Sequence, residues 1–363
     1  MDNKKSFRQL ELVPYLLRKN TYPHKTSKIR VEETHISWII LTGLYAYKIK
    51  KELKFGKVLD FSTLRLRKTA CKREVVLNRI LCNDMYKGVV KIVRFYDNNN
   101  HYSTNNNKDA KIQITDLRYK GKAIEYAVKM KQIPQRLRMD NLVAANKVNL
   151  RTIQKLAHTL VKFHRATRTN TTIKHFGQPN FMKAKVLENF ETLRKLYGSG
   201  YDNNNSNDIS KLERKLISFI ENNKQLFHQR IAENKIRDIH GDLYMKNIFI
   251  LQQNKKFYLY DRIEFNNSLR YADVAEDVAH ICMDLDYQKR SDLKRHFLSS
   301  YIEESRDFQL NLLIHFLMCY KACIRAKVCF FKAVNEKNME GKVMCLRESN
   351  DHLKLAKSYL QFL

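Results

Sequence analysis

The chain has 363 residues, of which 44% are hydrophobic and 29% are charged, and this balance excludes an intrinsically disordered protein. Its 68 Lys and Arg residues against 37 Asp and Glu residues give a net charge of +31, which favours polyanionic partners such as nucleotides and nucleic acids. The basic residues are spread along the whole chain without a tract of five or more, so a general compositional bias explains the charge equally well.

The first third of the chain is predicted to be rich in β-strands. The runs "HISWIIL" and "YAYKIKK" flank a "TGL" turn, which indicates a β-hairpin over residues 35–51. Further strand-like runs lie at 87–96, 110–119 and 123–133. Ahead of them, the stretch 67–85 carries apolar residues at helical spacing and predicts one helix.

The rest of the chain is predicted to be mainly helical. The helical patterns cover 142–168, 181–196, 209–233 and the region beyond 271. Two short strands are expected at "IFIL" and "FYLYD", separated by a turn at 252–256. Two stretches rich in Asn, at 96–111 and 197–208, are typical of surface loops or insertions.

This order of elements predicts an α+β fold with a bilobal arrangement in one domain. Residues 1–132 would form a β-rich N-terminal lobe with one helix, and residues 133–363 a mainly helical C-terminal lobe. A cleft between two such lobes is the natural place for a site.

Several classes of protein are not expected. The longest apolar runs, such as "SWIILTG" and "HFLMCY", fall far short of the roughly 20 residues that a membrane span needs, and the first residues lack the apolar core of a signal peptide. We therefore expect a soluble, cytoplasmic protein without a membrane partner. The seven cysteines form no C-x-x-C pair, which argues against a disulfide framework or zinc site and favours buried, reduced thiols.

The stretch "RDIHGDLYMKNIFIL" holds the polar groups that phosphoryl transfer needs. Such a reaction requires a carboxylate that orients the acceptor hydroxyl, oxygen ligands for Mg²⁺ and a cation on the nucleotide phosphates. Asp242 is the candidate for the first role, and Asn247, five residues later, offers a neutral amide oxygen to Mg²⁺. Asp261, at the end of "FYLYD", offers a carboxylate, and this pair of oxygen ligands suits Mg²⁺ better than zinc.

The cation is expected on the hairpin strand "YAYKIKK". Alternation along a strand places Ala46, Lys48 and Lys50 on one face. Lys48 fits best, because the small Ala46 two residues earlier leaves room for an adenine ring, while Lys50 is the competing choice. Glu74, on the following predicted helix, is well placed to fix the lysine by an ion pair.

The motif "IHGDLYMKNIFI", with Asp261 fourteen residues after Asn247, resembles the aminoglycoside phosphotransferase-like kinases, which are relatives of the eukaryotic protein kinases. The stretches "VEETHISWIILTGLYAYKIKKELKFGKVLDFSTL" and "DRIEFNNSLRYADVAEDVAHICMDLD" look like a bacterial subgroup whose kinase-like region is often fused to a P-loop ATPase region. The resemblance extends from about Arg30 to Leu285, followed by a looser helical tail.

The resemblance implies an ATP- and Mg²⁺-dependent phosphotransferase with the same five residues in its site. Asp242 would be the catalytic base, Asn247 and Asp261 the Mg²⁺ ligands, and Lys48 with Glu74 the phosphate-binding pair of a nucleotide-binding N-terminal lobe. It further implies that His240 is a structural member of the catalytic loop, that Asp273 braces this loop, and that "AVKMKQIP" is the hinge whose backbone meets adenine.

Three features depart from the pattern of these kinases. The first hairpin holds only Gly43 rather than a G-x-G-x-x-G loop, and Arg262 rather than Phe-Gly follows Asp261. No G-x-x-x-x-G-K-[ST] motif occurs, so any function that needs a P-loop ATPase would require a separate polypeptide as partner.

The expected reaction is transfer of phosphate from ATP to a hydroxyl of a sugar or another small polar metabolite. An alternative is a catalytically inactive kinase-like protein that binds nucleic acid or another polyanion, and a third reading is a kinase directed at proteins. The carboxylates of 273–286 either hold a cationic substrate or form a solvated helix face, the latter favoured for Asp284 and Asp286. His158 and His164 are expected to pack rather than to bind metal.

Overall fold

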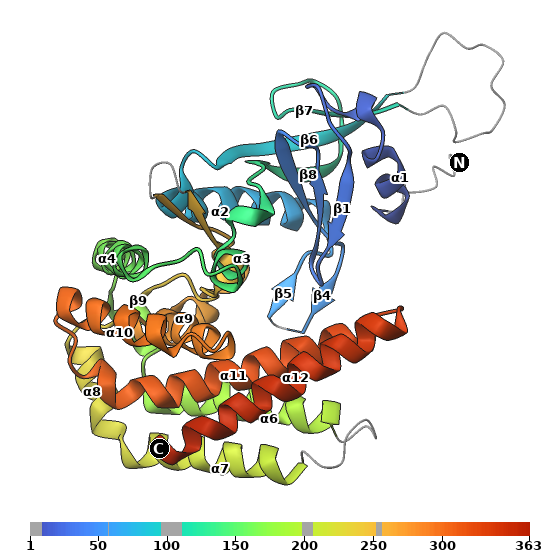
Figure 1. Cartoon of the computed structure of the whole chain (residues 1–363). Coiled ribbons are helices and arrows are strands. Elements are labelled where there is room, and N and C mark those ends of the chain that lie inside the picture. The colour runs from blue at the N-terminus through green and yellow to red at the C-terminus, as the bar shows by residue number, and fades with distance from the viewer. Residues whose placement is uncertain (1–8, 57, 96–110, 198–205, 252–255) are drawn as a thin grey trace, which may run out of the picture. The chain divides into compact units, whose positions relative to one another are not determined.

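The computed structural model describes residues 9–56, 58–95, 111–197, 206–251 and 256–363 (Figure 1). Contacts divide the chain into two compact units: Met1–Gln135 with Tyr258–Asn266, and Arg136–Phe257 with Asn267–Leu363. The first unit thus includes a segment, Tyr258–Asn266, that the sequence-based division placed in the second lobe. The two Asn-rich stretches and the turn expected at 252–256 lie mostly outside the described residues.

An antiparallel sheet with the strand order β1-β2-β3-β8-β6-β7 forms the centre of the first unit. The predicted hairpin is confirmed, since β2 pairs with β3 and Ile39 lies opposite Lys48. Its described residues also form a small β4–β5 hairpin and two α-helices, where the sequence predicted one helix. Its elements are β1 (Arg30–Glu33), β2 (Ser37–Leu41), β3 (Tyr45–Lys50), β4 (Lys54–Phe55), β5 (Leu59–Asp60), β6 (Tyr86–Phe95), β7 (Lys111–Asp116), β8 (Ala123–Lys131), α1 (Val13–Leu16) and α2 (Leu64–Cys82).

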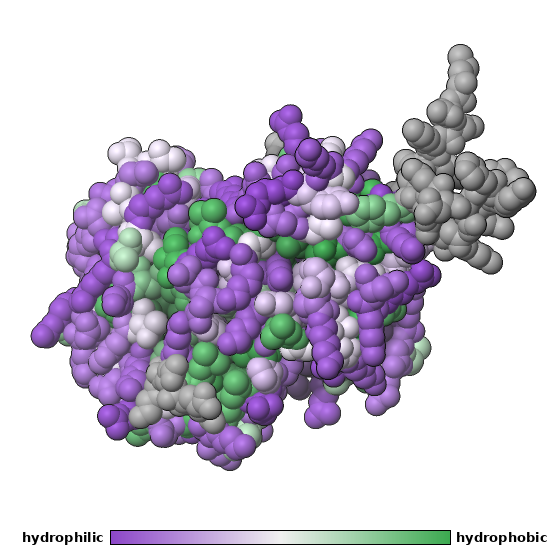
Figure 2. All heavy atoms as spheres, turned by 90° about the horizontal axis from the view of Figure 1, so that it is seen from above, coloured by the Kyte–Doolittle hydropathy of each residue, from purple (hydrophilic) through white to green (hydrophobic). Residues whose placement is uncertain are grey.

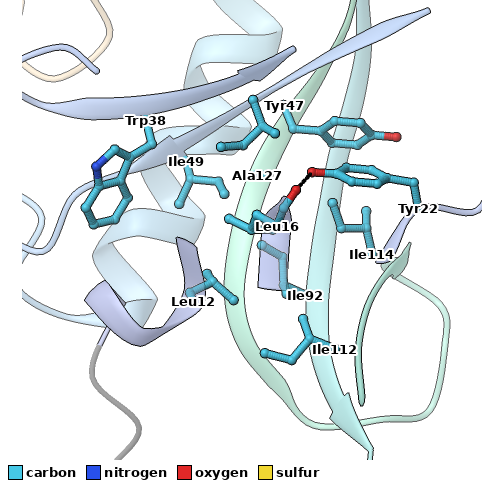
Figure 3. Close-up of a cluster of buried hydrophobic side chains, with 11 residues drawn as sticks. Leu12, Leu16, Tyr22, Trp38, Tyr47, Ile49, Ile92, Ile112, Ile114 and Ala127 are labelled. Carbon is cyan, nitrogen blue, oxygen red and sulfur yellow. Dashed lines mark hydrogen bonds between the residues drawn. The ribbon is translucent and has the colours of Figure 1, made fainter. Parts of the chain in front are cut away.

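A hydrophobic cluster on this sheet anchors the N-terminal segment (Figure 3). Leu12 and Leu16 of the short helical turns pack with Tyr47, Ile49 and neighbouring side chains of the strands. The Tyr22 hydroxyl donates a hydrogen bond of 2.5 Å to the Leu16 carbonyl, which fixes the chain as it leaves α1 (Figure 3). Because each buried aliphatic side chain contributes about 1.5–3 kcal/mol, the cluster ties residues 9–22 to the sheet.

Helix α2 contacts strands β6 and β8 of the same sheet. It begins after Thr63, whose side-chain oxygen accepts a hydrogen bond from the Leu66 amide and so caps the first turn. Its buried positions recur at helical spacing and include two charged residues, Arg67 and Glu74, of which Glu74 has no exposed surface. A buried carboxylate needs partners, and they are described below.

The second unit is mainly helical. Helix α11 packs along α12 and α9, and α10 packs against α4. The patterns at 142–168 and 209–233 predicted single helices, but each is broken in two, at Ala145–Asn149 and at Asn223. The helices are α3 (Met139–Ala144), α4 (Leu150–Ala166), α5 (Thr171–His175), α6 (Pro179–Tyr197), α7 (Ser206–Asn222), α8 (Lys224–Ala232), α9 (Ala275–Tyr287), α10 (Ser291–Ser305), α11 (Leu310–Asn335) and α12 (Met339–Tyr359).

Two short β-pairs accompany these helices. The predicted strands β10 (Ile248–Leu251) and β11 (Lys256–Leu259) form a two-stranded sheet, and β9 (Ile236–Asp238) pairs antiparallel with β12 (Tyr271–Asp273). The β9–β12 pair was not expected from the sequence, because three-residue strands are too short to show a period. It flanks the stretch that carries His240 and Asp242.

The state of the cysteines agrees with the expectation from the sequence. All seven cysteines are free and six are buried, as expected. In the described part of the chain, no helix is long and apolar enough to cross a membrane.

Hydrophilic side chains cover most of the face in Figure 2, with hydrophobic ones in small groups between them. Such scattered apolar residues are normal on folded proteins and do not by themselves indicate a docking face.

Leu16 and Leu17 give a matched test of the N-terminal anchor. Leu16 is fully buried and Leu17 is 48% exposed. We expect Leu16→Ala to lower the free energy of unfolding by about 2–5 kcal/mol, because it leaves a cavity, and Leu17→Ala to change it by less than about 0.5 kcal/mol. Urea denaturation followed by circular dichroism measures both, and equal effects of the two substitutions would contradict the packing described here.

Candidate functional site

Lys48 on β3 lies in the first unit with two of the carboxylates that the sequence pointed to. Its Nζ is 3.1 Å from Oε1 of Glu74 on α2, and it also donates a hydrogen bond to Oδ1 of Asp261. Lys48 is 5% exposed and Glu74 is fully buried, whereas 39% of the Asp261 side chain is exposed. The structure therefore brings Lys48, Glu74 and Asp261 together.

The competing lysine, Lys50, lies deeper on the same strand. It is fully buried and forms ion pairs with Glu74 and Glu264. Burial lowers the pKa of Lys48 and Lys50, but the carboxylates around them outweigh this effect and raise both pKa values above their usual range. Both lysines are thus charged at neutral pH, and Lys48 is the one whose cluster reaches solvent, through Asp261.

Asp261 is held in an uncommon backbone conformation. Its φ is +64°, in the left-handed region that costs a residue other than glycine roughly 1–2 kcal/mol. The Asp261 amide donates a hydrogen bond of 3.2 Å to the Tyr86 hydroxyl, and the Arg262 amide donates one of 2.9 Å to Asn78 Oδ1. These contacts within the first unit offset the cost and direct the Asp261 carboxylate at Lys48.

Asp242 and Asn247 lie together in the second unit. The Asn247 Nδ2 donates hydrogen bonds to the carbonyl oxygen of Asp242, at 2.9 Å, and to its Oδ2, at 3.4 Å. Because both of these bonds use the amide nitrogen, Oδ1 of Asn247 is left to accept a cation or a proton donor. The Asp242 side chain is 42% exposed, so its carboxylate can be reached by a ligand.

The loop that carries Asp242 is fixed by Asp277 of α9. The Asp277 carboxylate accepts hydrogen bonds from the His240 amide, at 2.8 Å, and the Gly241 amide, at 3.0 Å. Gly241 has a φ of +90°, a conformation that side chains other than glycine rarely adopt. His164 Nε2 lies 3.1 Å from Oδ2 of Asp277, so His164 supports the brace and packs in the core, as expected. The same expectation was wrong for His158, whose side chain is 47% exposed.

The brace expected at Asp273 was wrong. Asp273 instead forms an ion pair with Arg230, whose other partner is Asp307, and it caps the amide of Ala275. Asp273 ends strand β12 and Asp277 lies in the first turn of α9, four residues later, and only the position of the loop decides which of them meets it.

The acidic residues of 273–286 are engaged by the protein itself. Glu276 pairs with Lys185 at 2.6 Å and Lys321 at 2.7 Å, and Asp284 accepts a hydrogen bond of 2.8 Å from the Met245 amide. Asp286 lies 2.8 Å from Lys294. The prediction of a solvated face was wrong for Asp284, which is 9% exposed, and for Asp286, whose side chain is 10% exposed. Lysines therefore neutralise Glu276 and Asp286, and a backbone amide occupies one oxygen of Asp284.

Three residues beside Asp242 were not singled out from the sequence. The His280 ring is 2% exposed, and its Nδ1 lies 3.8 Å from Oδ1 of Asp242. It stacks on Tyr244, with ring centroids 5.4 Å apart, and the guanidinium of Arg325 lies 4.5 Å from the Tyr244 ring centroid. Tyr244 stands within the quoted motif, but His280 and Arg325 come from α9 and α11, and no spacing in the sequence relates them to Asp242.

Comparisons with known proteins agree with this architecture. No family model matches the chain. It is 30% identical over 334 residues to uncharacterized proteins of Mycobacterium bovis and Mycobacterium tuberculosis, an alignment that covers 92% of this chain. The chain spans about 60% of the length of these relatives. Among solved structures, an ethanolamine kinase of Plasmodium vivax matches with a TM-score of 0.50 and 13% identity, over 90% of this chain and 81% of that chain.

This likeness establishes the fold. The mixed helix and strand chain, with its sheet of six strands in the first unit and its helical second unit, has the protein-kinase-like fold that the sequence predicted. The identity is too low to transfer an activity, so function has to be argued from the residues of this chain.

Glu276 offers a test of the buried charges in the second unit. Burial by itself raises the pKa of Glu276, but the positive charges of Lys185 and Lys321 outweigh this effect. The pKa therefore falls from the usual 4.5 to about 2. Since the folded pKa is lower than the unfolded one, the ion pairs stabilise the fold fully above the unfolded pKa, and the stabilisation is lost as the pH falls towards 2.

We expect Glu276→Gln to lower the free energy of unfolding by about 3–5 kcal/mol at pH 7, and by clearly less at pH 3. Urea denaturation at pH 7, 5, 4 and 3 measures the difference, with Glu303→Gln on the exposed surface of α10 as the control. A difference between wild type and Glu276→Gln that stays constant down to pH 3 would contradict the proposed ion pairs.

Proposed function

We propose that the protein is an ATP- and Mg²⁺-dependent phosphotransferase of the aminoglycoside phosphotransferase-like class, which acts on a hydroxyl of a small polar metabolite. The observation that carries this proposal is the cluster of Lys48, Glu74 and Asp261. Lys48 is a buried, charged lysine held from one side by a buried glutamate and from the other by a partly exposed aspartate in a strained conformation. This is the arrangement that phosphate binding requires.

Lys48 would bind the phosphates of ATP. Glu74 is fully buried and fixes the lysine on its strand, so the ammonium is oriented before the nucleotide arrives. The nucleotide phosphates would take the place of the Asp261 carboxylate at Lys48, which frees Asp261 for a metal ion. Lys50 would not touch the nucleotide, since its charge is satisfied by Glu74 and Glu264.

Asn247 and Asp261 would supply the protein oxygens for Mg²⁺. Their donor set, one amide oxygen and one carboxylate, fits a hard cation that keeps several waters and takes phosphate oxygens as further ligands. When bound, Mg²⁺ neutralises charge on the phosphates. The hydrogen bonds from Asn247 to Asp242 would fix the orientation of this amide and leave its oxygen available to the ion.

Asp242 would orient the acceptor hydroxyl and receive its proton. The hydroxyl oxygen forms a bond to the γ-phosphorus, the bond from this phosphorus to the β–γ bridging oxygen breaks, and ADP leaves. The loop hydrogen bonds to Asp277 hold the backbone before Asp242 in place during this step. A partly exposed carboxylate beside the neutral ring of His280 is suited to this role.

Two other functions give different experimental outcomes. A basic binding protein without catalysis would bind nucleic acid or another polyanion with an affinity that falls steeply with salt and that survives Asp242→Asn. A protein-directed kinase would place the phosphate on a polypeptide. We favour a small-molecule acceptor. A separate P-loop ATPase is a candidate partner, because the subgroup that this sequence resembles joins a kinase-like region and a P-loop ATPase region in one chain.

MgATP is expected to raise the thermal stability of the wild type. A ligand present at about 100 times its dissociation constant stabilises the native state by about 2.7 kcal/mol. This stabilisation should be lost in Asp261→Asn, because the variant lacks the carboxylate for Mg²⁺, and kept in the control Asp60→Asn, which alters an exposed carboxylate bonded to Ser62. Differential scanning fluorimetry with and without Mg²⁺ measures the shift. No shift in the wild type would contradict a nucleotide site.

Asp242→Asn should separate catalysis from nucleotide binding. The amide cannot take the hydroxyl proton, so we expect the rate of phosphate transfer to fall by about 10²–10⁴ while the MgATP-dependent rise in melting temperature is unchanged. Release of ADP in the presence of hydroxyl compounds measures the rate. Equal rates for wild type and variant would remove Asp242 from the proposed mechanism.

A further inference from the structure

Arg325 is a buried arginine that forms no ion pair with a carboxylate of the described residues. It lies on α11 and is 8% exposed, and its guanidinium lies 4.5 Å from the centroid of the Tyr244 ring. With the residues that the structure describes, it forms no ion pair and no hydrogen bond. None of its nitrogens is both buried and unpaired, so the charged end reaches solvent.

This situation sets Arg325 apart from other buried arginines of the second unit. Arg230 is bound by Asp273 and Asp307, and Arg270 by Asp238. Such partners are expected, because an unpaired buried cation is costly. A stacked guanidinium that lacks a carboxylate but faces water is available to an anionic ligand, and its fork of N–H groups matches a phosphate or carboxylate.

Arg325 is connected to the proposed catalytic base by two aromatic rings. Its guanidinium contacts Tyr244, the Tyr244 ring stacks on His280 at an angle of 16°, and His280 Nδ1 lies 3.8 Å from Oδ1 of Asp242. All four residues belong to the second unit. A small molecule whose hydroxyl meets Asp242 would therefore present its other end to this row of side chains.

Groups of both signs act on the region of Arg325, and the carboxylates of Asp242 and Asp284 raise the pKa of its guanidinium. Burial and the positive charges of Arg325 and Lys246 lower the pKa of His352 to about 3. The His352 ring is therefore neutral. Partial burial lowers the pKa of Lys332, and the positive charges of Arg325 and Lys246 lower it further. Glu348, which accepts a hydrogen bond of 3.6 Å from Cys329 Sγ, raises the pKa of Lys332 and so partly opposes these cations.

A cationic acceptor lacks a counterpart in this region. The carboxylates of α9 that face the loop are engaged: Glu276 by two lysines, Asp277 by loop amides and His164, and Asp284 by the Met245 amide. Asp242 itself is reserved for the hydroxyl in the proposed reaction. A cation would thus meet Arg325, Lys246 and Lys332 without a free carboxylate to bind.

We propose that the phosphate acceptor carries an oxyanion, a phosphate or a carboxylate, in addition to its hydroxyl, and that Arg325 binds this oxyanion. The proposal rests on the proposed kinase function for the role of Asp242. It restricts the acceptor to anionic hydroxyl compounds, such as phosphorylated or acidic sugars, and assigns to Arg325 the choice between anionic and cationic substrates.

The test uses the full chain and four small probes. Glycerol 3-phosphate and glycerate each join a hydroxyl to an oxyanion, glycerol lacks the charge, and ethanolamine carries the opposite one. Binding is measured by calorimetry for wild type, Arg325→Met, Lys48→Met and the control Arg295→Met, which alters an exposed residue of α10. The phosphate and the carboxylate probes distinguish the two kinds of oxyanion.

We expect at least one of the two anionic probes to bind the wild type and to lose about tenfold or more in affinity in Arg325→Met. The affinity should be kept in Lys48→Met, where the nucleotide contact is removed, and in Arg295→Met. Arg325→Lys should lie in between, since it keeps the charge without the bidentate fork. Binding of ethanolamine in preference to the anions, or an anion affinity that depends on Lys48 and not on Arg325, would overturn the proposal.

MgATP distinguishes failure of this proposal from failure of the kinase function. MgATP should raise the melting temperature of Arg325→Met as much as that of the wild type, which also establishes that the variant is folded. Loss of anion binding in Arg325→Met without any MgATP effect in either protein would support an anion site and overturn the kinase function. Unchanged anion binding in Arg325→Met, beside a normal MgATP effect, would leave the kinase function and overturn the role of Arg325.

Discussion

The first unit depends on one network of buried opposite charges. Lys48 and Lys50 project from one face of β3 towards Glu74 of α2, and Asp261 and Glu264 complete the network from a segment more than 200 residues further along the chain. Burial of each charge alone would be prohibitive, so every member needs the others. The network therefore joins strand, helix and distant segment, and it explains why Tyr258–Asn266 belongs to the first unit.

The same network suits the proposed nucleotide site. Lys50, Glu74 and Glu264 are inaccessible and hold the remaining two members in place, whereas Asp261 is partly exposed and its backbone is strained. Ion pairs occupy the buried side of this cluster, and its other side is open to solvent. In the proposed function, a phosphate can therefore replace the Asp261 carboxylate at Lys48 without rearrangement of the strand. The second unit follows the same principle, since Asp277 fixes the loop and leaves the carboxylate of Asp242 accessible.

The sequence predicted most of the fold because its signals are local. The alternation in "YAYKIKK", the helical spacing of 67–85 and the strand pair after Asn247 each depend on neighbouring residues, and each is found in the structure. Breaks at Ala145–Asn149 and Asn223, and the short strands β9 and β12, escaped prediction because tertiary contacts decide them.

Contacts between residues far apart in the sequence limited how much of the site could be predicted. Lys48 and Lys50 share one strand face, so only the positions of Glu74, Asp261 and Glu264 distinguish them. Arg325 stands in the mostly apolar stretch "CYKACIRAKVCFF" and gives no sign in the sequence that it meets Tyr244. Such residues can be found only when the packing of the helices is known.

The measurement that most directly tests the account is the affinity of MgATP for Lys48→Met, determined by calorimetry under conditions where circular dichroism confirms the fold. We predict a loss of about tenfold or more relative to wild type, because the phosphates lose a charge-assisted contact. The affinity should be unchanged in Lys51→Met, which alters a nearby lysine that pairs with Glu33. Equal affinities of wild type and Lys48→Met would contradict the assignment of this cluster as the nucleotide site.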